Sequence, residues 1–365
     1  MSKARQLADL GNVYDDGALS NRNLIINGAM QVAQRGTSFT SVSSTAYHLD
    51  RFQSNIGGAA TGVSTITQSS DAPDGFGKSY KLEVTTADSS IASTAEYGLY
   101  HYLEGQNLQS LKKGTSAAVP LTVSFWVKAN FTGTFVVELM DNDNSNRHIN
   151  KSYTVDSANT WEYKTITFAG DTTGTLDDDN GNSFHLNFWL GGGTNYTSGT
   201  LQTSWGALDQ SGRGVGQTNV YGTLGNTWQV TGVQLEVGDT ATPFEHRSYG
   251  DELARCQRYF WSLNSNGINN KYLGQGANYN TTACYAHFPF PTEMRSIPTL
   301  TPSDGTHFQV VENGSVKDAS GVTLSGSSSN QGAVVIFSAS VSQGDASLIR
   351  TDANTNVYLW FDADL

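Results

Sequence analysis

The chain has 365 residues, 38 of them glycine, and only 15% of its residues are charged. Its formal net charge is −12 at pH 7 and no cluster of Lys and Arg is visible, which argues against nucleic acid or an anionic membrane as a partner. The 16 Tyr, 16 Phe and 7 Trp exclude a disordered chain, and the Gly, Ser, Thr and Asn content favours short strands joined by polar turns.

The first 22 residues are predicted to form an extended N-terminal arm. They lack the apolar run of a signal peptide, and no stretch of the chain reaches the length of a transmembrane helix, so we expect assembly in the cytoplasm without export or membrane insertion. The arm is either a frayed terminus or an attachment segment that becomes ordered on a neighbouring protein. The residues expected to make that attachment are Ala4, Leu7, Leu10, Val13 and Tyr14.

From residue 23 onward, apolar and polar side chains alternate with a period of two, as in strands with one buried face. The clearest run has apolar residues at Phe184, Leu186, Phe188 and Leu190, with His185, Asn187 and Trp189 between them. Several such strands joined by polar turns predict an all-β protein whose residues 23–247 form a jelly-roll-like antiparallel β-sandwich.

The sandwich is expected to end in a strand, followed by a short helix. The apolar phase of residues 230–237 slips at Gly232, which predicts a β-bulge. Ser248 is a candidate N-cap for a helix over about 249–260, within a connecting segment 248–261.

Residues 262–365 are predicted to form a smaller C-terminal β domain. Its last run, residues 357–365, carries large apolar side chains in both phases. Such a strand is buried either within its own domain or against another subunit.

Aromatic side chains in and beside the long Gly/Ser/Thr-rich segment 191–227 are candidates for glycan binding. A long loop in a compact domain is usually functional or disordered, and exposed rings can stack on sugars. The candidates are Tyr196, Trp205 and Tyr221, together with Trp189 on the polar phase of the preceding strand. For each of them, loop packing or a subunit contact is the alternative.

The sequence contains no catalytic motif that outweighs a structural explanation. Asp177 and Asp179, before an Asn-Gly bend, resemble half of a calcium loop, although turn chemistry explains them as well. We therefore expect no cofactor, with a structural Ca²⁺ as the alternative. Cys256 and Cys284 show no metal or redox spacing and are expected to be buried free thiols, although a disulfide is open to them.

Two segments resemble a module found in tail-fibre and other minor structural proteins of tailed bacteriophages. The first is NLIINGAMQVAQRGTSF at residues 23–39, followed by YHLDRF at 47–52, and the second is TGVQLEVGDTATPFEHRSYGDELARCQRYFW, which ends at Trp261. The resemblance implies that Leu24–Ile26 and residues 230–237 lie close together and close the sandwich. It also implies a homotrimer in the virion tail, which residues 1–22 attach to other phage proteins.

Four functions remain open at this point. The first is a non-enzymatic tail fibre or fibre-like appendage involved in host attachment. The second, compatible with the first, is recognition of host surface polysaccharide. A polysaccharide-degrading tailspike would require β-helix repeats or an acid pair, and neither is visible. A head-decoration, baseplate or connector component without receptor binding is the remaining alternative.

Overall fold

The computed structural model describes residues 21–365 and divides the chain into two compact units, with the boundary between Tyr249 and Gly250. The expected boundaries had given residues 248–261 a segment of their own. The predicted attachment residues Ala4, Leu7, Leu10, Val13 and Tyr14 lie outside the described residues.

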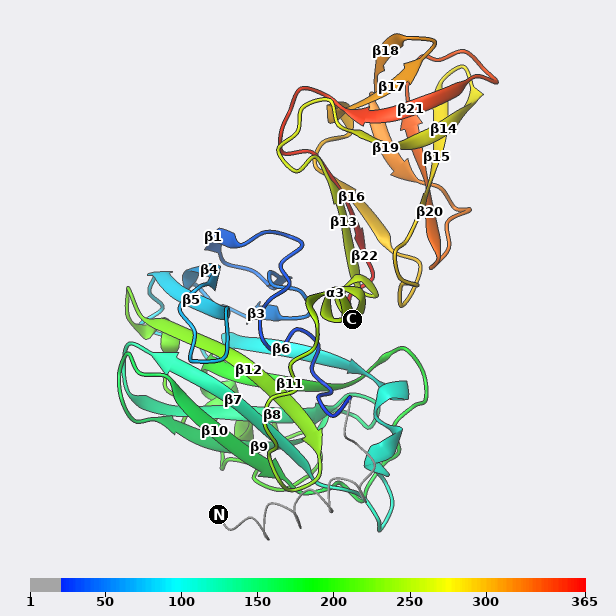
Figure 1. Cartoon of the computed structure of the whole chain (residues 1–365). Helices are drawn as coiled ribbons and strands as arrows, with labels where there is room; N and C mark the ends of the chain where they lie inside the picture. Colours follow the sequence, from blue (N-terminus) through cyan, green and yellow to red (C-terminus); the bar gives the residue numbers. More distant parts are fainter. Residues whose placement is uncertain (1–20) are drawn as a thin grey trace. The chain divides into compact units, whose positions relative to one another are not determined.

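The first unit is a sandwich of two six-stranded antiparallel sheets (Figure 1). Sheet A has the order β1 (Ser38–Val42), β4 (Val63–Ser69), β5 (Ser79–Thr86), β12 (Thr227–Val237), β7 (Leu121–Ala129) and β10 (Glu162–Phe168). Sheet B has the order β2 (Ala46–Tyr47), β3 (Gln53–Gly57), β6 (Glu96–Glu104), β11 (Asn182–Gly192), β8 (Gly133–Asp141) and β9 (Arg147–Val155). The prediction of an all-β, jelly-roll-like antiparallel sandwich is confirmed.

The hydrophobic core lies between the two sheets and follows the predicted alternation. On β11, Phe184, Leu186 and Phe188 belong to the core cluster. The intervening residues of β11 therefore lie on the opposite, outer face of sheet B. His185 and Trp189 on that face are nevertheless only 4% and 0% exposed, so another part of the chain covers it.

The opening segment of the sandwich packs beside its last strand, as the resemblance implies. The Leu24 amide donates to the Leu235 carbonyl at 2.9 Å, and the Val233 amide donates to the Gly28 carbonyl at 2.9 Å. The predicted strand Leu24–Ile26 is not assigned as a strand. A side chain at Gly28 would place its Cβ 2.0 Å from the Val233 oxygen, so only glycine allows this close approach.

The predicted bulge in β12 is confirmed. Gly232 has a φ of +61°, and the register between β12 and β7 shifts between Thr231 and Gln234. Before the bulge, residues 228–230 of β12 pair with both β5 and β7. After the bulge, residues 234–237 pair with β7.

The segment from residue 193 to residue 219, named here the covering loop, folds over the outer face of sheet B. The covering loop contains the short helices α2 (Thr194–Thr197) and η3 (Gln210–Gly212). Three further short helices among the described residues of this unit lie outside it: η1 (Gly105–Asn107), η2 (Gln109–Leu111) and η4 (Val220–Gly222). Backbone hydrogen bonds join the covering loop to β9: the Asn150 amide donates to the Gln202 carbonyl at 2.8 Å, and the His148 amide donates to the Gly206 carbonyl at 3.1 Å.

All of α3 (Tyr249–Gln257) except its first residue belongs to the second unit, and it is the predicted helix in a slightly shorter form. A three-stranded sheet has the order β13 (Phe260–Asn264), β22 (Tyr358–Asp362) and β16 (Thr299–Pro302). A seven-stranded sheet has the order β18 (Ser315–Asp318), β17 (Phe308–Glu312), β21 (Ala346–Thr351), β14 (Tyr272–Asn280), β15 (Ala283–Pro289), β20 (Gly332–Ser338) and β19 (Gly321–Leu324). The turn η5 (Gly305–His307) precedes β17.

The last strand, β22, lies in the middle of its sheet. Leu359 and Phe361 are fully buried in the core of the second unit, whereas Tyr358 and Trp360 are half-buried and stack at 4.1 Å. One face is therefore buried within the domain. Packing of the other face against a second subunit stays a prediction.

Cys256 and Cys284 are both buried free thiols, as expected. No helix within residues 21–365 is long and apolar enough to cross a membrane.

Candidate functional site

Tyr221 lies inside the sandwich and not on its surface. It is 1% exposed, its ring stacks on that of Tyr97 at 4.0 Å, and its hydroxyl lies 3.1 Å from the Ser64 Oγ. Both ring faces are thus occupied by the protein. The prediction that Tyr221 binds a glycan is wrong, because loop composition does not show which rings fold inward.

Trp205 is half-buried at a different place. Its Nε1 donates to the Ala169 carbonyl at 2.7 Å, its ring lies 5.7 Å from that of Phe184, and the Lys113 ammonium is 6.0 Å from its centroid. Lys113 in turn forms a buried ion pair with Asp141 at 2.5 Å. These contacts give Trp205 a packing role at the edge of the core.

Trp189 and Tyr196 are the two candidates that the structure brings together, with ring centroids 5.4 Å apart. Trp189 is fully buried, which corrects the prediction that it contacts a ligand directly. Tyr196, in α2, is half-buried, and burial together with the charge of Glu96 raises the pKa of its hydroxyl. The Arg213 guanidinium lies 5.0 Å from the Trp189 ring centroid and 5.8 Å from that of Tyr196. Trp189 and Arg213 therefore pack against the Tyr196 ring.

Arg213 is held by a buried carboxylate on β8. Its Nε donates to the Glu138 Oε1 and one terminal nitrogen donates to the Oε2, both at 2.8 Å. Burial acts to raise the pKa of Glu138, but the charge and hydrogen bonds of Arg213 outweigh it and hold that pKa well below its usual range. The Glu138 Oε2 also accepts from the Trp189 Nε1 and the Asn187 Nδ2, each at 3.2 Å. One carboxylate thus fixes three neighbouring side chains.

The outer face of sheet B carries a cross-strand row of polar and aromatic residues. The strand register places five of them side by side: Gln53, Tyr100, Asn187, Glu138 and Asn150. His185, in the neighbouring row, stacks on Tyr100 with centroids 5.0 Å apart. Both His185 ring nitrogens and the Asn187 Oδ1 are buried without a hydrogen-bond partner, and burial lowers the pKa of His185 to about 4. Unpaired polar atoms of this kind are costly and mark a region that is not optimised for stability alone.

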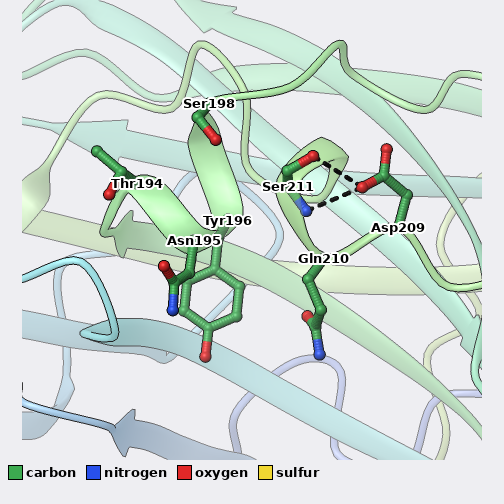
Figure 2. A pocket seen from close by; sticks show the side chains of 7 residues that line it. All are labelled: Thr194, Asn195, Tyr196, Ser198, Asp209, Gln210 and Ser211. Carbon is green, nitrogen blue, oxygen red and sulfur yellow. Dashed lines mark hydrogen bonds between the residues drawn. The ribbon is translucent and has the colours of Figure 1, made fainter.

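A pocket of about 570 Å³ opens beside this row, between α2 and η3 (Figure 2). Seven residues line it: Thr194, Asn195, Tyr196, Ser198, Asp209, Gln210 and Ser211. Figure 2 shows the Tyr196 and Gln210 side chains pointing the same way, and Asp209 beside Ser211. The pocket therefore combines one aromatic ring with hydroxyl, amide and carboxylate groups.

Local sequence explains the shape of the pocket. Gly193, before α2, lies so close to the segment that precedes β6 that a Cβ would be 1.9 Å from the Ala92 carbonyl oxygen. Asp209 caps η3, because its Oδ1 accepts from the Ser211 amide at 3.0 Å and from the Ser211 hydroxyl at 2.8 Å. The two walls are joined by a hydrogen bond of 3.0 Å from the Gly199 amide to the Ser211 carbonyl.

Sequence reasoning named Tyr196 and Trp189, the latter in the wrong role, and missed the other residues of the site. Tyr100 and Tyr102 alternate with core residues of β6, in the same way as Trp189 does on β11, so strand phase could have identified them. Arg213 and Asp209 lie in a Gly-rich stretch without periodicity, where no signal in the sequence indicates which side chains fold toward the sheet.

The calcium hypothesis gains no support from the geometry. The Asp179 Oδ1 accepts from the Gly181 amide at 2.7 Å and so closes its own turn, and the Asp177 amide donates to the Asp143 Oδ2 at 2.9 Å. Throughout the described part of the chain, no three His, Cys, Asp or Glu side chains are grouped so that they could hold a metal ion.

Comparisons with known proteins find no matching family model and no matching curated protein. Among solved structures, the enzymatically active domain of tailspike protein 4 of bacteriophage CBA120 is 13% identical with a TM-score of 0.32, and the match covers 59% of this chain and 21% of that one. A family 11 carbohydrate-binding module from Clostridium thermocellum, in complex with a β-1,3-1,4-mixed-linked tetrasaccharide, is 14% identical with a TM-score of 0.28, covering 57% and 99%.

The N-terminal cellulose-binding domain of Cellulomonas fimi β-1,4-glucanase C is 10% identical with a TM-score of 0.27, covering 59% and 95%. The chain thus spans about a fifth of the tailspike structure and nearly all of the two binding modules. At these identities and TM-scores, none of the three says what this chain binds or does.

Proposed function

We propose that the first unit binds carbohydrate in the pocket between α2 and η3. The observation that carries this proposal is the lining of the pocket, in which the Tyr196 ring stands beside the side chains of Asn195, Gln210 and Ser211. An aromatic face packs against the C–H face of a sugar ring, and amides and hydroxyls pair with sugar hydroxyls.

The support beneath Tyr196 favours binding because it is already in place. Trp189 is fully buried under the pocket, and the paired charges of Arg213 and Glu138 fix its indole. A ring held in this way loses little conformational freedom when a ligand stacks on it, so more of the contact energy becomes affinity.

The same geometry favours binding over hydrolysis. A glycosidase needs a carboxylic acid whose pKa is raised so that it can donate a proton. Asp209 is the one carboxylate among the seven residues that line the pocket, so the lining offers no pair of carboxylates, and the buried Glu138 behind it is kept ionised because Arg213 holds its pKa well below the usual range. We therefore propose a non-enzymatic role for this site.

Binding isotherms with a panel of oligosaccharides test the proposal. Tyr196→Ala should weaken binding at least tenfold, and Ser198→Trp, which fills the pocket without removing any support, should do the same. Tyr163→Ala is the matched control, because Tyr163 is a 45% exposed tyrosine on β10 of sheet A. Equal affinity of all four proteins, each with an unchanged melting temperature, would exclude this pocket.

For the whole chain we propose a non-enzymatic virion role, as a tail fibre or fibre-like appendage that contributes to host attachment. Its support is the resemblance of residues 23–39, 47–52 and 231–261 to a module of phage structural proteins. In this proposal the chain forms a homotrimer, docks through residues 1–22 and recognises host surface polysaccharide.

Labelling of purified virions with an antibody to the second unit would test the virion role by locating the protein. Wild-type protein that binds host cells, with Tyr196→Ala binding weakly, supports attachment. Virion location without cell binding would instead favour a head-decoration, baseplate or connector component.

A further inference from the structure

The pocket between α2 and η3 has an unusual balance of charge. None of its seven lining residues is Lys or Arg, whereas Asp209 supplies a carboxylate. Glu96 adds a second carboxylate near Tyr196, and its charge helps to raise the pKa of the Tyr196 hydroxyl. The electrostatic character of the pocket is therefore negative, in a chain whose net charge is already −12.

The nearest cation does not offset that charge. Arg213 directs its Nε and one terminal nitrogen at Glu138, and its other terminal nitrogen donates to the Gln210 Oε1 at 3.2 Å. It is only 6% exposed. The charge of Arg213 is thus paired with that of Glu138, and three of its five N–H donors are engaged within the protein, so it supplies little net positive charge to attract a ligand carboxylate.

The two carboxylate oxygens of Asp209 have different surroundings. Its Oδ1 accepts from the Ser211 amide and hydroxyl, whereas no residue among 21–365 donates to the Oδ2. Asp209 is exposed, so the Oδ2 faces solvent or ligand. An ionised carboxylate only accepts hydrogen bonds, which suits the hydroxyls of a sugar and repels another carboxylate.

From this arrangement we infer that the pocket selects uncharged saccharides over acidic ones, with Asp209 as the specificity-determining residue. The inference rests on the proposed carbohydrate binding and goes beyond it by naming the ligand class. Neutral hexoses and N-acetylhexosamines fit. Uronic acids, sialic acids and phosphorylated or sulfated glycans are disfavoured by the carboxylates of Asp209 and Glu96.

The test compares ligands that differ only in charge. Neutral gluco-, galacto- and manno-oligosaccharides are each paired with the product of selective oxidation at C6, which converts the CH₂OH group into a carboxylate. Calorimetry at pH 7 and low ionic strength should show the neutral member binding about tenfold more tightly. Added salt should reduce the difference.

Two variants separate charge from shape. Asp209→Asn keeps an acceptor at the cap and removes the charge, so it should reduce the tenfold preference to about threefold or less. Asp239→Asn removes the same charge from an exposed turn after β12 and should leave the preference unchanged.

The possible outcomes distinguish the two claims. Oxidised ligands that bind as tightly as neutral ones, with affinity lost in Tyr196→Ala, would overturn the selectivity and leave carbohydrate binding intact. A preference that is the same in Asp209→Asn as in the wild type would overturn the role of Asp209. Absence of binding by every member of the panel would overturn both claims.

Discussion

The two sheets of the sandwich share one core and have very different outer faces. Sheet A presents Thr, Lys and Glu side chains and exposed ion pairs such as Lys81–Glu83, at 2.8 Å, whose side chains are 29% and 48% exposed. Sheet B presents a buried row of rings, amides and one bidentate Arg213–Glu138 pair, covered by the loop of residues 193–219.

The comparison shows which features on the outer face of sheet B are not needed to form the hydrophobic core of the sandwich. A sandwich needs only one apolar face on each sheet, and the polar side chains that sheet A buries on its outer face, such as Gln234 and Glu236, accept hydrogen bonds from residues 242–245. Sheet B buries charges and leaves His185 and the Asn187 Oδ1 without partners, which costs stability. The charges and unpaired polar atoms buried beneath the covering loop are therefore not explained by the needs of the hydrophobic core.

The largest effect is expected from breaking the buried pair of sheet B. Arg213→Ala leaves Glu138 buried and unpaired, which should lower the free energy of unfolding by about 3–5 kcal/mol. Urea unfolding followed by tryptophan fluorescence measures this change.

The double variant Glu138→Gln, Arg213→Met removes both charges and keeps an acceptor for the Trp189 Nε1. It should be clearly more stable than Arg213→Ala. If the two variants were equally unstable, the cost would come from lost packing and not from the unpaired charge.

The fold could be predicted from the sequence because strand alternation is a local signal. The phase of residues 184–190 identified the core face of β11, and the slip at Gly232 identified the bulge of β12. The proximity of Leu24 to Leu235 came from the resemblance and not from any local pattern. No pattern in the sequence gives the strand order, because pairing depends on contacts distant along the chain.

The site was predicted only in part, for a physical reason. Aromatic residues in a Gly-rich loop can point inward or outward at similar cost in local conformation, so Tyr221 and Tyr196 look alike in sequence. Tertiary contacts decide between them: Tyr221 stacks on Tyr97 in the core, whereas Tyr196 rests on Trp189 beside a pocket. Glu138 and Arg213 are 75 residues apart in the sequence, so no local pattern indicates that they form an ion pair.

The second prediction concerns pH. Burial, assisted by Arg213 and opposed by Glu138, lowers the pKa of His185 to about 4. An unfolded histidine titrates near 6.5, so between pH 6.5 and about 4 the unfolded chain binds a proton that the folded chain does not. Stability should therefore be complete above pH 6.5 and fall as the pH is lowered through this window, by up to about 3 kcal/mol from this residue.

Chemical unfolding at pH 7 and pH 4.5 measures that loss. His185→Phe keeps a ring for stacking on Tyr100 and does not titrate, so its stability should fall less over the same interval. His48, whose pKa burial also lowers to about 4, contributes in the same direction in both proteins. The strands of sheet A contain no histidine and add nothing to this effect. If the wild type and His185→Phe lost equal stability between pH 7 and pH 4.5, His185 would not be its cause.

The third prediction concerns how tightly the cross-strand row on the outer face of sheet B is packed. A Cβ at Gly98 would lie 2.5 Å from the Asn187 Oδ1 and 2.7 Å from a ring carbon of Tyr100. Gly98→Ala should therefore cost about 1–3 kcal/mol and displace the row. Gly77→Ala, where a Cβ meets nothing within 4 Å, is the matched control. Thermal melting compares them, and similar melting temperatures would show that the row tolerates movement.

The smallest effect is expected on sheet A. Lys81→Ala breaks an exposed ion pair with Glu83, and because both side chains are well solvated the free energy of unfolding should change by less than about 1 kcal/mol. Any loss should disappear in 0.5 M salt, since mobile ions screen exposed charges. The ligand affinity of the pocket should stay unchanged, because Lys81 belongs to β5 of the other sheet. A loss as large as that of Arg213→Ala, or a fall in ligand affinity, would mean that the outer faces are not independent, and the division into a supporting sheet and a binding sheet would have to be abandoned.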